Sequence, residues 1–162
     1  MSKNINIDSH HTAVVDDEDV EKVSGHSWRI VGRDRGPWYA MCQPNQKGLY
    51  MHHLIAGTPP KGMTIDHING NSLDNRKENL RVATQQQQRM NSAKRVDGAS
   101  RYKGVIIRNV TGRCKKTRIC AQIKALGRSI YLGDFETEEE AAEAYNKAAV
   151  QYFGEFARVN SL

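Results

Sequence analysis

Three kinds of side chain between residues 66 and 91 can carry out hydrolytic chemistry together. Asp66 offers a carboxylate oxygen, the hard type of ligand that Mg²⁺ prefers. His67 follows it directly, and an imidazole with an ordinary pKa of about 6.5 can take a proton from water near neutral pH. The amides of the glutamines at 85–88 and of Asn91 come shortly afterwards and can complete a metal site. This combination indicates hydrolysis of a phosphodiester bond.

Turn signals define the elements that must position these groups. A strand predicted over 63–68 meets an Asn-Gly pair, the strongest short turn signal. A polar loop then leads to a second short strand at about 79–82. Thr84 follows it as the predicted cap of a helix that continues to about residue 95.

Asp66 and His67 are adjacent in the predicted strand, which bears on whether they share a site. Neighbouring residues of a strand point to opposite faces, although this alternation relaxes at a strand end, and here the turn follows at once. The Asp-His pair alone therefore leaves a structural interpretation open, in which Asp66 starts a hydrogen-bonded turn and His67 packs.

The run DHINGNSLDNRKENLRVAT, with MHHLI upstream, closely resembles phage-type HNH homing endonucleases, over roughly residues 12–95. The resemblance implies a ββα-metal fold, also called a His-Me finger, with its core at about 61–91. It also implies that His67 activates the attacking water and that Asp66 binds one divalent ion, Mg²⁺ or Mn²⁺. Asn79 matches the central asparagine of the family, which braces the loop between the two strands.

The function implied by this resemblance is a metal-dependent DNA endonuclease of the homing type. Such an enzyme hydrolyses a phosphodiester bond to a 5′-phosphate and a 3′-hydroxyl. With one active site per chain, a monomer would nick one strand of the duplex.

One position departs from the family pattern. The family helix resembles ATQQQN, whereas this chain has ATQQQQ, so Gln88 stands where the second metal ligand is an asparagine. Glutamine sets its amide oxygen one methylene further from the backbone, and Mg²⁺ tolerates displaced ligands poorly. The alternative function is therefore an HNH-derived DNA-binding protein with weakened or lost cleavage and a regulatory or inhibitory role.

The charge distribution indicates a polyanionic partner. The formal net charge is +6. Residues 101–128 hold nine Lys and Arg and no acidic residue, whereas 129–162 hold two basic and seven acidic residues. A stretch with one sign of charge is the electrostatic footprint of nucleic-acid binding, and we predict double-stranded DNA as the partner. A solvated basic face, or an acidic protein partner, is compatible with the same pattern.

The last segment predicts a domain of its own after a linker at 92–100. Three β-rich runs, YKGVIIRNV, TRICAQIKAL and RSIYLGDF, precede a capping box formed by Thr137 and Glu140. Apolar residues then recur on one helix face at Ala141, Ala142, Tyr145, Ala148, Ala149 and Tyr152. A three-stranded antiparallel sheet packed on one helix is therefore expected over 101–162.

This segment, most specifically YLGDFETEEEAAEAYNKAA and FGEFARVN, resembles the DNA-binding domain of plant ethylene-response factors. The resemblance implies a sheet that lies in the DNA major groove. Ile107 replaces a family aromatic, and Ile119 and Cys120 replace an aromatic and an arginine, so we expect phosphate contacts to survive better than base readout. The predicted DNA contacts are Arg101, Lys103, Arg108, Arg118, Lys124 and Arg128, together with His52, which matches an upstream histidine of the HNH family.

The segment before the nuclease core is expected to frame it. A short helix is predicted within 13–31, with Asp16 as its N-cap and Gly25 at its end. A small antiparallel meander follows at roughly 28–31, 38–43 and 48–50, and MHHLIAG then forms one or two helical turns.

The overall fold class is α+β, with an HNH nuclease domain at 1–91. The chain contains no apolar run long enough to span a membrane, and its first residues lack the apolar stretch of a secretion signal. Its three cysteines form no CxxC pair and are odd in number, which fits a reducing compartment. We therefore expect a cytoplasmic protein without a membrane partner. We expect a monomer, and the sequence leaves self-association open as the alternative.

Overall fold

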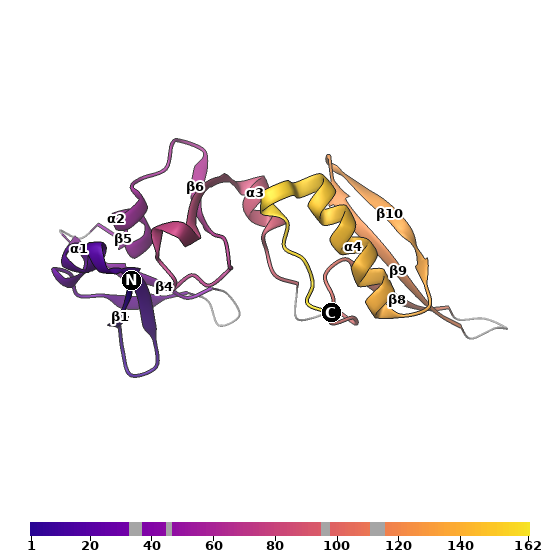
Figure 1. Ribbon diagram of the computed structural model, residues 1–162, viewed down its shortest axis with the longest axis horizontal. Coiled ribbons are helices and arrows are strands. Elements are labelled where there is room, and N and C mark those ends of the chain that lie inside the picture. Colours follow the sequence, from indigo (N-terminus) through magenta and orange to yellow (C-terminus); the bar gives the residue numbers. More distant parts are fainter. Residues whose placement is uncertain (33–36, 45–46, 95–97, 111–115) are drawn as a thin grey trace. The chain divides into compact units, whose positions relative to one another are not determined.

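The computed structural model describes residues 1–32, 37–44, 47–94, 98–110 and 116–162 (Figure 1). The chain divides into two compact units, Met1–Gln88 and Arg89–Leu162. Part of the linker predicted at 92–100 lies outside the described residues. Among the described residues, no helix is long and apolar enough to cross a membrane.

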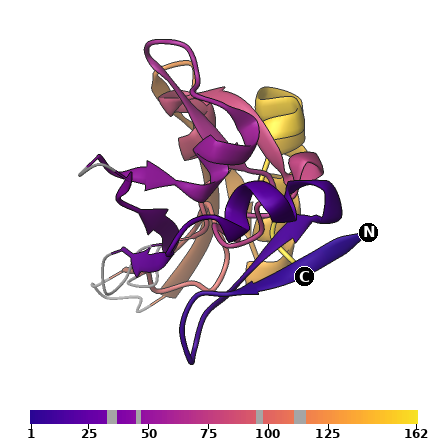
Figure 2. The same cartoon turned by 90° about the vertical axis from the view of Figure 1, so that its left-hand side faces the viewer.

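The N-terminal unit begins with short strands and helices. In chain order these are β1 (Ser2–Asn6), β2 (Thr12–Asp16), a 3-10 turn (Asp17–Asp19), α1 (Val20–Ser24), β3 (Arg29–Val31), β4 (Tyr39–Cys42), β5 (Leu49–Tyr50) and α2 (Met51–Ala56). β1 and β2 form an antiparallel hairpin, and β3, β4 and β5 form a separate antiparallel sheet in that order (Figure 2). The predicted meander and the helical turns at MHHLIAG are confirmed.

The hairpin of β1 and β2 is absent from the sequence-based expectations, and it moves the start of the first helix. Asp16, the predicted N-cap, is the last residue of β2 and pairs with Ser2. Its carboxylate accepts a hydrogen bond from the backbone N–H of Lys77 at 2.8 Å and makes no capping bond. The α-helix therefore begins at Val20, and the cap prediction is wrong, whereas Gly25 follows the helix as expected.

The second half of this unit is a strand, a loop, a strand and a helix. Its elements are β6 (Met63–His67), a 3-10 turn (Lys77–Asn79), β7 (Leu80–Thr84) and α3 (Gln85–Met90). β6 and β7 pair antiparallel. Thr84 and Gln87 exchange hydrogen bonds as a capping box, which confirms the predicted helix start. The helix ends at Met90, so the predicted continuation to about residue 95 is wrong. Just beyond this end, the hydroxyl of Ser92 donates a hydrogen bond to the carbonyl of Arg89.

The hydrophobic core of this unit joins the hairpin to the first two helices. Its buried members are Ala13, Val15, Val23, Ala40, Met51 and Ile55. β2 also contacts the loop between β6 and β7 directly: the N–H of Val14 donates to the carbonyl of Leu73 at 2.8 Å, and the N–H of Asn75 donates to the carbonyl of Val14 at 2.7 Å. The hairpin therefore supports the loop that follows His67.

The C-terminal unit is an antiparallel sheet with one helix packed on it. Its elements are β8 (Val105–Val110), β9 (Lys116–Ala125), β10 (Arg128–Phe135), α4 (Glu138–Phe153) and a 3-10 turn (Gly154–Phe156), and the sheet order is β10-β9-β8 (Figure 1). The capping box of Thr137 and Glu140 is present as predicted.

Small side chains bring α4 close to the sheet. The buried face of α4 consists of Ala141, Ala142, Tyr145, Ala148, Ala149 and Phe153. Tyr152 is 38% exposed, so its assignment to this face is wrong, and Phe153 fills the position beside the sheet. Gly104 has a φ of +81°, and a Cβ there would lie 1.9 Å from the Tyr145 ring, so only glycine fits.

Candidate active site

Asp66 is held at the end of β6 by the strand beside it. The register places Asp66 opposite Arg81 of β7. One carboxylate oxygen, Oδ2, accepts hydrogen bonds from Nε and Nη2 of Arg81 at 3.1 and 3.0 Å. Asp66 is 5% exposed. The guanidinium therefore balances the charge of a carboxylate that is withdrawn from water.

His67 is the next residue of β6 and is equally buried, with 6% of its surface exposed. Its Nε2 lies 3.3 Å from Oδ1 of Asn75. Its ring centroid is 5.3 Å from that of His52 and 6.2 Å from that of Tyr39. Burial lowers the pKa of His67, although the Asn75 hydrogen bond and the charges of nearby aspartates oppose this shift. His67 is therefore an uncharged imidazole at neutral pH, the form that accepts a proton.

Asn79 joins the two ends of the loop between β6 and β7. Its Oδ1 accepts from the backbone N–H of Asn69 at 2.9 Å, and its Nδ2 donates to the carbonyl of Asp74 at 2.7 Å. Its own carbonyl accepts from the N–H of Ile68 at 2.9 Å. One buried amide therefore holds the chain on both sides of the turn that follows His67.

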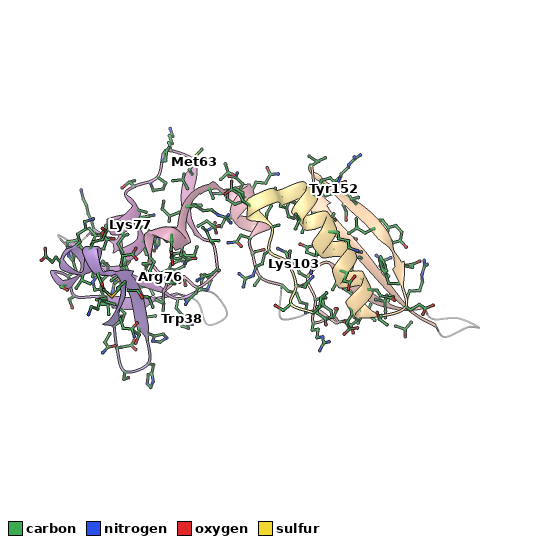
Figure 3. The ribbon with its side chains drawn as sticks, viewed as in Figure 1. Trp38, Met63, Arg76, Lys77, Lys103 and Tyr152 are labelled. Carbon is green, nitrogen blue, oxygen red and sulfur yellow. The ribbon has the colours of Figure 1, made fainter. Side chains whose placement is uncertain are left out.

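Two basic residues tie the far end of this loop down (Figure 3). Arg76 donates to both carboxylate oxygens of Asp74 at 2.7 and 2.8 Å, and this guanidinium lowers the pKa of Asp74. The Nζ of Lys77 lies 3.2 Å from a carboxylate oxygen of Asp19, which is fully buried. The Arg76–Asp74 bonds hold the loop internally, and the Lys77–Asp19 ion pair attaches it to the segment before α1.

His52 lies in a cluster of aromatic rings with His53, His67, Tyr39 and Tyr50. It stacks on Tyr50 at a centroid distance of 5.4 Å and meets His53 at 4.4 Å. Burial, with smaller contributions from the two neighbouring histidines, lowers the pKa of His52 to about 3. His52 is therefore buried and uncharged at neutral pH, and its role as a DNA contact stays a prediction.

The two metal ligands predicted from the sequence, Asp66 and Gln88, both offer oxygen atoms. Gln87 is engaged in the capping box of α3, and Gln88, the next residue, is half-buried. The described ranges contain no group of three or more His, Cys, Asp or Glu side chains that could hold a metal. A site based on Asp66 would therefore combine one carboxylate with amide oxygens and water. That donor set fits Mg²⁺, which keeps several waters and needs only one or two carboxylates.

Two of the predicted DNA contacts in the C-terminal unit, Arg101 and Arg118, bind acidic side chains of the protein itself. Arg101 donates to Glu139 at 2.7 Å and lies over the Tyr102 ring, and Arg118 forms an ion pair with Asp134. These pairs are exposed, so both guanidinium groups can still reach an external phosphate.

Lys103 is half-buried and bonded to backbone carbonyls, and its assignment as a DNA contact stays a prediction (Figure 3). Its Nζ donates to the carbonyls of Met90 and Ser92 at 2.6 and 2.7 Å. Burial, followed by the charge of Arg158, lowers its pKa to about 8. Lys103 therefore satisfies carbonyls at and just beyond the end of α3.

Of the remaining predicted contacts, Arg108 and Lys124 lie on the exposed side of the sheet, whereas Arg128 pairs with Ala125 and so belongs by register to the face that packs on α4. Arg108, Lys124 and Arg128 are exposed. Arg108 is opposite Arg118 in the register, while Ala121 and Ile123 on the other face of β9 are buried. The alternation of β9 therefore separates a basic face from the face that packs on α4.

The sequence does not identify the residues that surround His67. Asn75 and the rings of Tyr39 and Tyr50 carry no motif or spacing that marks them as neighbours of the site. Asn75 belongs to the same loop, but Tyr39 and Tyr50 come from the β3-β4-β5 sheet. A loop asparagine flanked by Asp74 and Arg76 was the one local signal available.

Comparison with known proteins identifies the segment that carries this geometry. Residues 50–90 match the family described as HNH endonuclease. The uncharacterized HNH endonuclease L560 of Acanthamoeba polyphaga mimivirus is 36% identical to this chain over 109 residues, which are 67% of the chain and 53% of that relative. The chain thus spans about half the length of this curated relative. No solved structure gives a significant match.

Proposed function

We propose that this chain is a metal-dependent DNA endonuclease of the homing type, because residues 50–90 match the HNH endonuclease family. It acts as a cytoplasmic monomer and nicks one strand of double-stranded DNA, leaving a 5′-phosphate and a 3′-hydroxyl. The observation that carries the proposal is the buried pair of Asp66 and His67 on β6, followed by a loop that Asn79 closes inside the matched segment.

His67 is the general base in this proposal. Its low exposure keeps bulk water away, and its lowered pKa keeps the imidazole ready to take a proton from the attacking water. Asn79 positions this base indirectly, because it fixes the chain immediately after His67. A fixed base avoids the loss of rate that a misplaced group would cause.

Asp66 and Gln88 are the residues that would hold the divalent ion, Mg²⁺ or Mn²⁺. When bound, such an ion stabilises the negative charge that develops on the phosphate and on the leaving oxygen. Two hydrogen bonds from Arg81 hold the Asp66 carboxylate in place beside β7. The ion pair also means that a metal must share this carboxylate with a guanidinium group.

Gln88→Asn is expected to raise the nicking rate. The shorter side chain brings the amide oxygen one methylene closer to the helix, where the family pattern has its ligand. Misplacement of a reacting group by about 1 Å can cost on the order of 10²-fold in rate, so the gain can approach that size. Single-turnover nicking of supercoiled plasmid in Mg²⁺ measures it, with Gln86→Asn on the same helix as the control. An unchanged rate would show that residue 88 does not limit catalysis.

The pH dependence of nicking follows from the environment of His67. Only the neutral imidazole acts as the base, and burial lowers the pKa of His67 below its ordinary value. The rate is therefore expected to stay constant as pH falls to about 6.5 and to decline only at lower pH. Single-turnover rates between about pH 5 and pH 8 test this, with plasmid binding measured in the same buffers. A decline that begins well above pH 6.5 would point to a different base.

The exposed sheet face of the C-terminal unit is the proposed DNA-binding surface. Arg108→Gln combined with Lys124→Gln is expected to lower the slope of log affinity against log salt by about 2, because two phosphate contacts are lost. Lys147→Gln removes a charge from the exposed side of α4 and serves as the control. Mobility shifts of a short duplex over a salt series give the slopes. Equal slopes for the double variant and the control would contradict binding through this face.

A DNA-binding protein that does not cleave is the second candidate function. The observation that favours it is Gln88, which departs from the ligand expected at this helix position. Incubation of supercoiled plasmid with the protein and either Mg²⁺ or Mn²⁺ separates the two functions. Nicking that disappears in His67→Ala supports the enzyme, whereas a mobility shift without nicking supports the second candidate.

A further inference from the structure

Asn75 is a completely buried polar side chain in the loop between β6 and β7. It is 1% exposed, and both polar atoms of its side chain have hydrogen-bond partners. Its side-chain Nδ2 donates to the carbonyl of Leu73 at 3.2 Å and to the sulfur of Met51 at 3.4 Å. Its Oδ1 lies 3.3 Å from Nε2 of His67. Asn75 connects His67 to the core. It is neither one of the proposed metal ligands nor the proposed general base.

The contacts of Asn75 determine which way its amide faces. An amide nitrogen has two hydrogens to donate, and the carbonyl of Leu73 and the thioether of Met51 are both acceptors. The reversed amide would place its oxygen against the Leu73 carbonyl, where two acceptors would meet without a hydrogen between them. Such an arrangement leaves buried polar groups unsatisfied, which costs about 1–3 kcal/mol. Oδ1 therefore faces His67.

The amide orientation determines the tautomer of His67. Oδ1 of an asparagine can only accept, so the hydrogen between the two side chains must lie on Nε2 of the imidazole. In the neutral ring the other nitrogen, Nδ1, then carries the lone pair. A base that takes its proton from water needs that lone pair at one defined nitrogen.

The backbone around Asn75 is fixed from outside the loop. The N–H of Asn75 donates to the carbonyl of Val14, and the N–H of Val14 donates to the carbonyl of Leu73. A parallel bridge joins Val14 to Asp74. Val14 belongs to β2, and its neighbours Ala13 and Val15 pack in the hydrophobic core, so the N-terminal hairpin holds the asparagine in register with the histidine.

We infer that Asn75 is a positioning residue that locks His67 in the Nε2–H tautomer. The catalytic part of this inference rests on the proposed nuclease function, whereas the tautomer itself does not. Loss of a comparable tautomer-setting partner in a protease triad costs about 10⁴-fold in kcat. A neutral amide polarises the ring less than a carboxylate, so we expect a smaller loss here, about 10- to 10³-fold.

The direct test is a long-range ¹H–¹⁵N NMR spectrum of the full-length protein at a pH where His67 is neutral. The spectrum distinguishes protonated from unprotonated ring nitrogens without any need for catalysis. The wild-type protein is expected to show His67 with a protonated Nε2 and an unprotonated Nδ1. The Nδ1–H tautomer, or a mixture of both tautomers, would overturn the inference.

Variants extend this test to catalysis. Asn75→Ala is expected to give a mixture of His67 tautomers and a lower kcat with an unchanged KM. Asn75→Asp keeps an oxygen that accepts from Nε2 and, when protonated, an O–H that can donate to Leu73, so it should restore the Nε2–H form. Asn71→Ala removes an exposed asparagine from the same loop and should leave the tautomer unchanged.

The outcomes separate the two levels of the proposal. If the wild-type protein holds the Nε2–H tautomer and Asn75→Ala loses it, but no form of the protein nicks DNA, then the nuclease function fails and the positioning role stands. If the protein nicks DNA and Asn75→Ala keeps a single Nε2–H tautomer at an undiminished kcat, then the positioning role fails. If Asn75→Ala does not fold, the wild-type and Asn75→Asp spectra decide the tautomer by themselves.

Discussion

The nicking rate of His67→Ala is expected to be about 10²- to 10⁴-fold lower than that of the wild-type protein, while affinity for DNA stays the same. Loss of a positioned general base typically costs that range of rate. DNA affinity persists because the proposed phosphate contacts lie on the C-terminal unit, far along the chain from this residue. Single-turnover conversion of supercoiled to open-circular plasmid measures the rate, and a mobility shift measures the affinity.

The matched control for this substitution is His53→Ala. His53 belongs to the same ring cluster and contacts His52 and Tyr50, and its pKa is also lowered by burial. Removing it changes the same number of atoms and the same type of side chain. The control is expected to retain nicking. Equal loss in both variants would mean that the ring cluster is structural and that His67 has no distinct chemical role.

Asp66→Ala is expected to abolish nicking and also to destabilise the N-terminal unit by about 3–5 kcal/mol. The second effect arises because Arg81 would keep its charge in a mostly buried position without its carboxylate partner. Both tryptophans of the chain, Trp28 and Trp38, belong to the N-terminal unit. Tryptophan fluorescence during urea unfolding therefore reports the stability of this unit separately from that of the other.

A double variant distinguishes the two roles of Asp66. Arg81→Met removes the guanidinium charge that Asp66→Ala leaves behind and fills similar space, so Asp66→Ala with Arg81→Met should recover most of the lost stability. It should still fail to nick DNA and to bind Mn²⁺, which titration calorimetry can follow. Recovery of nicking together with stability would show that Asp66 serves the ion pair alone. The single variant Arg81→Met completes the double-mutant cycle, which gives the interaction energy between Asp66 and Arg81.

Elements with strong local signals were predictable from the sequence. The Asn-Gly turn after His67 and the Thr84 cap place β6, β7 and α3 within a few residues of the expected positions. The capping boxes of α3 and α4 each use hydrogen bonds between residues three apart in the chain, so no distant partner is needed to identify them. The end of α3 was not predictable in the same way, because polar residues after Met90 continue without a strong breaker.

Elements that depend on distant partners were missed or misplaced. The hairpin of β1 and β2 has a weak alternation of its own and is held by core packing and by contacts with Leu73 and Asn75. The apolar face of α4 was extended to Tyr152, but the sheet takes Phe153. The period of a helix fixes which residues share a stripe, whereas the neighbouring sheet decides where that stripe ends.

The candidate site shows the same division between local and distant information. The motif places Asp66, His67 and Asn79, and the structure supplies their partners Arg81 and Asn75. The inward turn of Lys103 could not be anticipated, because its acceptors are backbone carbonyls that no sequence pattern marks. Basic residues on a strand therefore predict a charged surface better than they predict individual contacts.

Plasmid relaxation by the purified wild-type protein tests the proposed chemistry most directly. Supercoiled DNA is incubated with the protein in Mg²⁺, in Mn²⁺ and with a chelator, and the ends of any product are examined for phosphate. Open-circular DNA with 5′-phosphate and 3′-hydroxyl ends is expected in the presence of metal, with none when the chelator is added. Stable DNA binding without nicking in either metal would contradict the nuclease function and leave a DNA-binding protein.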